Sequence, residues 1–86
     1  MSAHTIKILG KNCGSCQWTE RLVRETLAER GLGPDVVVVE KVTSTSVMIG
    51  YGVMSTPAIV IDERVVHVGG IPKKGDVESW LSALTN

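Results

Sequence analysis

Aromatic side chains are scarce in this sequence of 86 residues, which has no Phe, one Tyr and two Trp. A hydrophobic core must therefore be built from aliphatic residues, and Val, Ile and Leu dominate the 43% hydrophobic fraction. This composition favours a globular α/β domain over a disordered chain. The length suits a single domain that spans residues 1–86.

Net charge is also lacking, because nine basic residues balance nine acidic ones. A neutral chain has no electrostatic preference for nucleic acid or for an anionic membrane surface, so we expect neither as a partner. No apolar run reaches the roughly 18 residues that a membrane-spanning helix requires. The first five residues lack the charged and apolar regions of a secretory signal, so we expect a cytoplasmic protein.

Cysteine occurs only twice, as Cys13 and Cys16. In a reducing compartment a cysteine pair seldom forms a structural disulfide and more often performs redox chemistry or binds metal. Zinc sites usually take four ligands, and the two histidines, His4 and His67, have no metal-ligand spacing to the cysteines. We therefore expect neither metal nor cofactor, with a soft-metal site and a structural disulfide as alternatives to redox exchange.

The hydrophobic pattern predicts an α/β fold with the element order βαβαββα. Strands are expected at Thr5–Leu9, Val36–Val42, Ala58–Ile61 and Val65–Val68, and helices at Gly14–Arg30, at about Ser46–Tyr51 and, after Pro72, at Val77–Leu84. Four consecutive valines, beginning at Val36, indicate a buried strand. The first helix must cross over between the first two strands, so these should be parallel, whereas the last two should form an antiparallel hairpin. The result is a mixed four-stranded sheet flanked by three helices.

The two cysteines enclose a glycine and a serine in the motif Cys13-Gly14-Ser15-Cys16, at the start of the first predicted helix. Their spacing places them one helical turn apart, which suits reversible disulfide formation. Unpaired N–H groups and the positive end of the helix dipole stabilise a thiolate at Cys13. We expect Cys13 to attack a partner disulfide and Cys16 to resolve the mixed disulfide. Gly14 leaves room for the partner to approach.

Two further segments carry a resemblance to a known family. Tyr51–Ile61 (YGVMSTPAIVI) resembles the thioredoxin-family segment that enters the third strand through a cis-proline, and Val65–Gly70 (VVHVGG) resembles the strand that follows, with its glycine end. In size the chain is most similar to small bacterial and archaeal thioredoxin-like redox-active disulfide proteins. The resemblance implies a thioredoxin-like fold and a thiol–disulfide oxidoreductase. It also implies disulfide-containing proteins as partners and a thioredoxin reductase or another donor as the source of electrons.

The resemblance also implies a substrate-binding surface beside the motif. Thr56 and Pro57 would form a cis peptide next to the first cysteine, so that the backbone N–H and C=O of Thr56 pair with an added substrate strand. Gly69 at the glycine turn, with Gly14 and Ser15 of the motif, would complete this surface.

Several residues depart from the thioredoxin pattern. Asn12 stands where thioredoxins have a tryptophan, Ser15 replaces the proline between the cysteines, and Lys7 occupies about the place of a buried acidic residue. These changes should alter the reduction potential and the handling of protons. Trp80 is expected to pack against the core, whereas Trp18 either packs or flanks the site.

Three other functions fit parts of the sequence. The loop around the cysteines also resembles the Cu(I) site of heavy-metal-associated domains. Those domains, however, end in a strand and lack a Thr-Pro before the third strand. A glutathione-linked glutaredoxin would use the same Thr56–Pro57 and glycine turn, but only Lys11 supplies a positive charge beside Cys13. A non-catalytic redox sensor is the third alternative.

Overall fold

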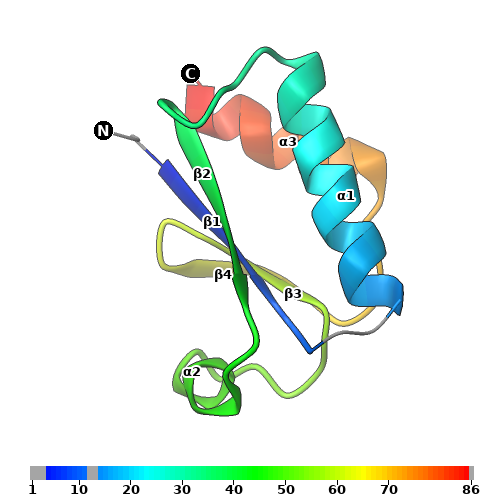
Figure 1. Cartoon of the computed structure of the whole chain (residues 1–86), viewed down its shortest axis with the longest axis vertical. Coiled ribbons are helices and arrows are strands. Elements are labelled where there is room, and N and C mark those ends of the chain that lie inside the picture. The colour runs from blue at the N-terminus through cyan, green and yellow to red at the C-terminus, as the bar shows by residue number, and fades with distance from the viewer. Residues whose placement is uncertain (1–3, 12–13, 86) are drawn as a thin grey trace.

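A computed structural model describes residues 4–11 and 14–85 of the chain, and its elements follow the predicted order (Figure 1). The elements are β1 (His4–Leu9), α1 (Gly14–Glu29), β2 (Val37–Val42), α2 (Thr45–Gly50), β3 (Ala58–Ile61), β4 (Arg64–Val68) and α3 (Lys74–Thr85). Each strand boundary lies within one residue of its predicted position. The third helix begins three residues earlier than predicted, because its first turn is polar and carries no hydrophobic periodicity.

The four strands form one mixed sheet in the order β2-β1-β3-β4. β1 pairs in parallel with β2, and β3 pairs antiparallel with β4, as the sequence predicted. β1 also pairs antiparallel with β3, which the sequence did not predict. Leu9 lies opposite Ala58 in the β1–β3 pair. The chain that leaves β1 therefore meets the chain that enters β3 at one end of the sheet.

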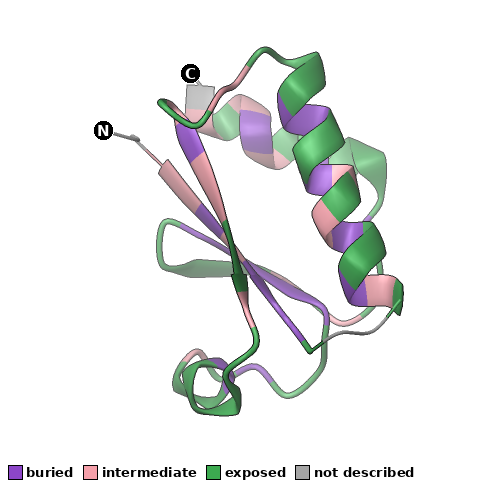
Figure 2. Ribbon diagram, in the orientation of Figure 1, coloured by how far each residue is buried: buried purple, intermediate pink, exposed green. Residues whose placement is uncertain are grey.

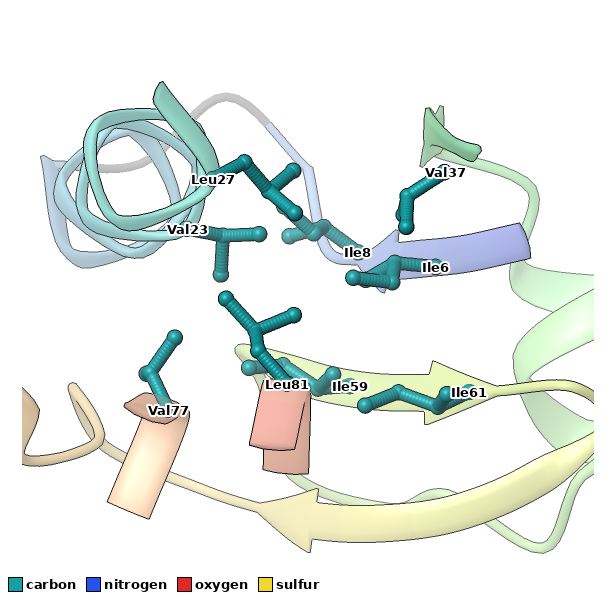
Figure 3. Packing of buried hydrophobic residues seen from close by; sticks show 9 residues of the cluster. All are labelled: Ile6, Ile8, Val23, Leu27, Val37, Ile59, Ile61, Val77 and Leu81. Carbon is teal, nitrogen blue, oxygen red and sulfur yellow. The ribbon is translucent and has the colours of Figure 1, made fainter. Parts of the chain in front are cut away.

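Helices cover both faces of this sheet. α1 and α3 pack on one face, where their apolar side chains meet Ile6, Ile8 and Ile59 from the central strands (Figure 3). The short helix α2 belongs to a second apolar cluster, in which Met48 packs with Leu9. Because alternate residues of β1 point to opposite faces, one strand supplies both clusters.

β2 differs from the prediction in its burial. The four consecutive valines indicated a buried strand, but only Val37 is buried and Val38 and Val39 are half-buried (Figure 2). The reason is the strand order: β2 forms an edge of the sheet, so one of its sides has no neighbouring strand. Local sequence does not specify which strand becomes an edge.

The hairpin between β3 and β4 is also tied to β1. Asp62 and Glu63 turn the chain with positive φ angles of 49° and 69°. The Asp62 carboxylate accepts a hydrogen bond from the Thr5 backbone N–H at 3.0 Å and pairs with Nδ1 of His4 at 2.7 Å. Thr5 in return accepts from the backbone N–H of Asp62 at 3.0 Å. These contacts fix the end of the molecule that lies opposite the candidate site.

Candidate functional site

The candidate site lies where β1 ends, α1 begins and the chain enters β3 (Figure 1). Cys13 and Asn12 lie outside the described residues, so the role assigned to Cys13 stays a prediction. Cys16 is described, and its side chain is fully buried on the inner face of α1.

Gly10 brings three segments together at this point. A Cβ atom added at Gly10 would overlap the Sγ atom of Cys16 and would lie 3.4 Å from the Cβ atom of Thr56. The backbone of Gly10 is held in place, because its N–H donates to the carbonyl of Val42 at 2.9 Å. Gly10 is therefore the residue whose missing side chain lets the Cys16 sulfur lie against the end of β1. Gly10 was not predicted from the sequence as a site residue, although its place three residues before the C-x-x-C motif was a usable signal.

The segment before β3 has backbone groups without hydrogen-bond partners close to the Cys16 sulfur. The Thr56–Pro57 peptide bond is cis, Pro57 is buried and Thr56 is exposed. In the described part of the chain, neither backbone polar group of Thr56 has a hydrogen-bond partner. An added strand pairs with backbone N–H and C=O groups that have no partner, as those of Thr56 do.

Gly69 supports the same segment from β4. Its N–H donates to the Pro57 carbonyl at 2.8 Å, and a Cβ atom at Gly69 would lie 3.5 Å from that of Ser55. With φ of +79°, Gly69 adopts a conformation that side chains rarely allow. The structure thus places Thr56, Pro57 and Gly69 in one group, and Gly10 links this group to Cys16.

Gly14 and Ser15 open helix α1. Gly14 is exposed, and a Cβ atom there would meet nothing within 4 Å, so the surface above it is open. A groove of about 340 Å³ runs beside it and is lined by Gly14, Gln17, Trp18 and Arg21. Trp18 is 59% exposed and has the Arg21 guanidinium 5.5 Å from its ring centre. Of the two possibilities for Trp18, the exposed position near the site is the one found.

Trp80 occupies the position expected of a packing residue. It is half-buried and packs against the apolar cluster between the sheet and the helices. Its ring lies 5.9 Å from that of His67, and His67 Nε2 lies 2.8 Å from the carbonyl oxygen of Gly70.

Lys7, in the place of a buried acid, is engaged in a polar network. Its ammonium donates to the Tyr51 hydroxyl at 2.8 Å and to the Glu63 carboxylate at 2.9 Å, and the Tyr51 hydroxyl donates to Glu63 at 2.7 Å. These hydrogen bonds, first with Tyr51 and then with Glu63, raise the pKa of Lys7 above its ordinary value. Lys7 therefore stays protonated at neutral pH and does not replace a carboxylate as a proton acceptor.

Exposed apolar side chains gather at the same end of the sheet. Of the eight large hydrophobic residues that are exposed in the described chain, six lie on α1 near its start, on α2, at the end of β4, or in the loops before β3 and after β4. They are Trp18, Val47, Ile49, Met54, Val68 and Ile71. From Val42 to Ile61 the sequence has no charged residue. We call these six residues the apolar rim.

Metal ligands are not assembled in the described residues. Across positions 4–11 and 14–85, no three His, Cys, Asp or Glu side chains are placed to hold a metal ion together. His4 is paired with Asp62 at the start of β1, whereas Cys16 lies against Gly10, beyond the other end of that strand. Over the same positions, no helix has the length and apolar character needed to span a bilayer.

Comparisons with known proteins agree with this geometry. A family model described as "Thioredoxin domain" matches residues 4–82. The thioredoxin of Methanothermobacter thermautotrophicus is 26% identical over 77 residues, which cover 90% of this chain and 96% of that protein. The thioredoxin of Methanocaldococcus jannaschii is 28% identical over 78 residues, covering 91% and 86% of the two chains.

Solved structures share the fold at lower identity. A chloroplastic thioredoxin z superposes with a TM-score of 0.69 at 16% identity, with 95% of this chain and 78% of that one covered. A structure of a thioredoxin in complex with ferredoxin:thioredoxin reductase gives a TM-score of 0.66 at 20% identity, covering 96% and 78%. The predicted thioredoxin-like fold is confirmed, and the terminal helix α3 is inconsistent with a heavy-metal-associated domain, which ends in a strand. The family match over residues 4–82, together with the arrangement of the strands and of Cys16, shows that this chain is a thioredoxin-type redox protein and belongs to the thioredoxin domain family.

Proposed function

We propose that this protein is a dithiol–disulfide oxidoreductase that exchanges electrons with protein disulfides, with Cys13 as the attacking residue and Cys16 as the resolving residue. The observation that carries the proposal is the buried Cys16 sulfur beneath the junction of Gly10 and Thr56. A resolving thiol must be shielded from outside disulfides yet lie within reach of the sulfur one helical turn away.

The exchange takes two steps. The Cys13 thiolate attacks one sulfur of the partner disulfide, so a mixed disulfide forms and the other partner sulfur leaves as a thiolate that takes up a proton. Cys16 then loses its proton and attacks the Cys13 sulfur. This step forms the Cys13–Cys16 disulfide and releases the second partner thiolate. Two electrons pass from the protein to the partner, and no cofactor is required.

In this proposal the start of α1 activates the Cys13 thiol. The first N–H groups of a helix have no partner within the helix, and the helix dipole is positive at that end. Both features stabilise an anion, which lowers the pKa of a thiol placed there. The first turn of α1 carries no acidic residue that would oppose this effect.

The apolar rim supports protein partners over glutathione. Glutathione carries two carboxylates, and a site built for it would offer basic side chains. Here the segment that contains Met54 and Thr56 has no charge, and Met54 is 96% exposed. An uncharged surface with exposed apolar side chains fits an extended stretch of protein chain that pairs with the backbone of Thr56.

Electrons must be returned to the disulfide by a donor. The reductase complex of the structurally similar thioredoxin supports a reductase-type donor for this protein as well. A reducing compartment such as the cytoplasm would suit the reaction, because the dithiol form is then regenerated.

An insulin-reduction assay tests the proposal directly. With dithiothreitol or a candidate reductase as donor, the wild-type protein should accelerate insulin reduction, and both Cys13→Ser and Cys16→Ser should lose multiple turnover. Cys16→Ser should in addition accumulate a mixed disulfide through Cys13, which mass spectrometry detects. Absence of both turnover and trapped partners would contradict catalysis and favour a redox sensor.

Two further measurements separate the alternatives. Anaerobic titration with Cu(I) should show only weak binding in competition with a chelator, whereas tight stoichiometric binding would favour a copper module. A Met54→Glu variant should slow insulin reduction while leaving the reduction of a small-molecule disulfide unchanged. Equal slowing of both substrates would show that the apolar rim does not bind protein partners.

A further inference from the structure

Two threonines lie on the inner face of α1, where a helix usually carries apolar residues. Thr19 and Thr26 are both fully buried. Each hydroxyl donates to the carbonyl four residues earlier, Thr19 to Ser15 at 2.8 Å and Thr26 to Leu22 at 2.7 Å. A buried hydroxyl needs a partner, so each bond satisfies its own side chain. The same chemistry in two places makes Thr26 an internal reference for Thr19.

The two bonds differ in the carbonyl that they hold. Ser15 stands between the two cysteines, and its carbonyl belongs to the turn of α1 that carries Cys16. In an α-helix this carbonyl already accepts the backbone N–H of Thr19, so the hydroxyl is a second donor to the same oxygen. A threonine bonded in this way tilts the carbonyl and bends the helix locally. The Thr26 bond acts on a carbonyl two turns away from the motif.

We propose that Thr19 is a positioning residue for the dithiol: by holding the Ser15 carbonyl, its hydroxyl sets the reduction potential of the Cys13–Cys16 pair. This inference rests on the proposed function. The second donor offsets part of the negative partial charge of the Ser15 carbonyl in the first turn of α1. A thiolate in that turn is then more stable, and thiolate stabilisation favours the reduced form and makes the pair more oxidising.

The test compares Thr19→Val with Thr26→Val, because both substitutions remove a hydroxyl and keep the shape of the side chain. Each protein is equilibrated in glutathione redox buffers, and the fraction of intramolecular disulfide is measured by mass spectrometry. Thr19→Val should shift the equilibrium constant toward the disulfide by about threefold or more, which corresponds to about 14 mV in potential. The equilibrium constant of Thr26→Val should stay near the wild-type value. That of Thr19→Ser should also stay near it, because serine keeps the hydroxyl.

Equal shifts in the two valine variants, or no shift in either, would overturn the proposal and leave Thr19 with a packing role alone. If Thr19→Val does not fold, Thr19→Ala removes the same hydroxyl and is compared with Thr26→Ala. Wild-type protein that forms no intramolecular disulfide would contradict the proposed function instead. In that event the alkylation rate of the reduced thiols by iodoacetamide still tests Thr19. Slowing by about threefold or more in Thr19→Val alone would support the positioning role, and equal rates would overturn it.

Discussion

Gly10→Ala introduces one methyl group at the junction of the three segments that form the site. The new Cβ atom would overlap the Cys16 sulfur and would lie 3.4 Å from the Cβ atom of Thr56. Cys16 is fully buried, and Gly10 is held by its hydrogen bond to Val42, so neither side can withdraw freely. Overpacking of this kind costs about 1–3 kcal/mol, and loss of the hydrogen bond would add about 1 kcal/mol.

We therefore expect Gly10→Ala to lower the free energy of unfolding by about 2–4 kcal/mol, with a fall in Tm of roughly 10–30 °C for a domain of this size. Urea unfolding of the reduced protein measures the effect. Gly14→Ala is the matched control, because a Cβ atom at Gly14 meets nothing within 4 Å. The control should change stability by less than about 0.5 kcal/mol.

A double-mutant cycle with Cys16→Ala identifies the atom responsible. Removing the sulfur also removes the main overlap, so Gly10→Ala should cost at least about 1 kcal/mol less in the Cys16→Ala background. The Gly10→Ala protein should also exchange disulfides more slowly, because the Cys16 sulfur must move. Equal stability of the two glycine variants, or additive costs in the cycle, would refute the assigned contact.

Three further predictions concern the rest of the fold. The Thr5 N–H and then His4 lower the pKa of Asp62 below its ordinary 3.8, so its charge stabilises the fold above that pH and the stabilisation is lost as the pH falls through the lowered pKa. Asp62→Asn should therefore flatten the acid limb of a stability–pH curve measured by urea unfolding, and an unchanged limb would contradict the pairing. Leu81→Ala empties a fully buried position and should cost about 2–5 kcal/mol, whereas a cost below about 1 kcal/mol would show that the site lies outside the core. Lys7→Met removes the ammonium that donates to Tyr51 and Glu63, and should lower the urea midpoint and shift near-ultraviolet circular dichroism from Tyr51; no change in either would show that these hydrogen bonds do not stabilise the fold.

The order of the elements was predictable because it depends on short stretches of sequence. Alternation and β-branching mark the strands, and the spacing of apolar residues marks α1. The crossover helix required a parallel pair of strands. The cis peptide bond between Thr56 and Pro57 could be predicted only from the resemblance of this segment to thioredoxins.

Contacts between distant segments were decided by the tertiary structure. The sequence does not state the order of strands in the sheet, so it could not show that the valine strand β2 is an edge or that Asp62 binds back to β1. Nor could it show that Trp18 stays exposed while Cys16 is buried against Gly10. Periodicity along the chain specifies the face on which a residue lies, whereas its neighbours depend on how those faces are stacked.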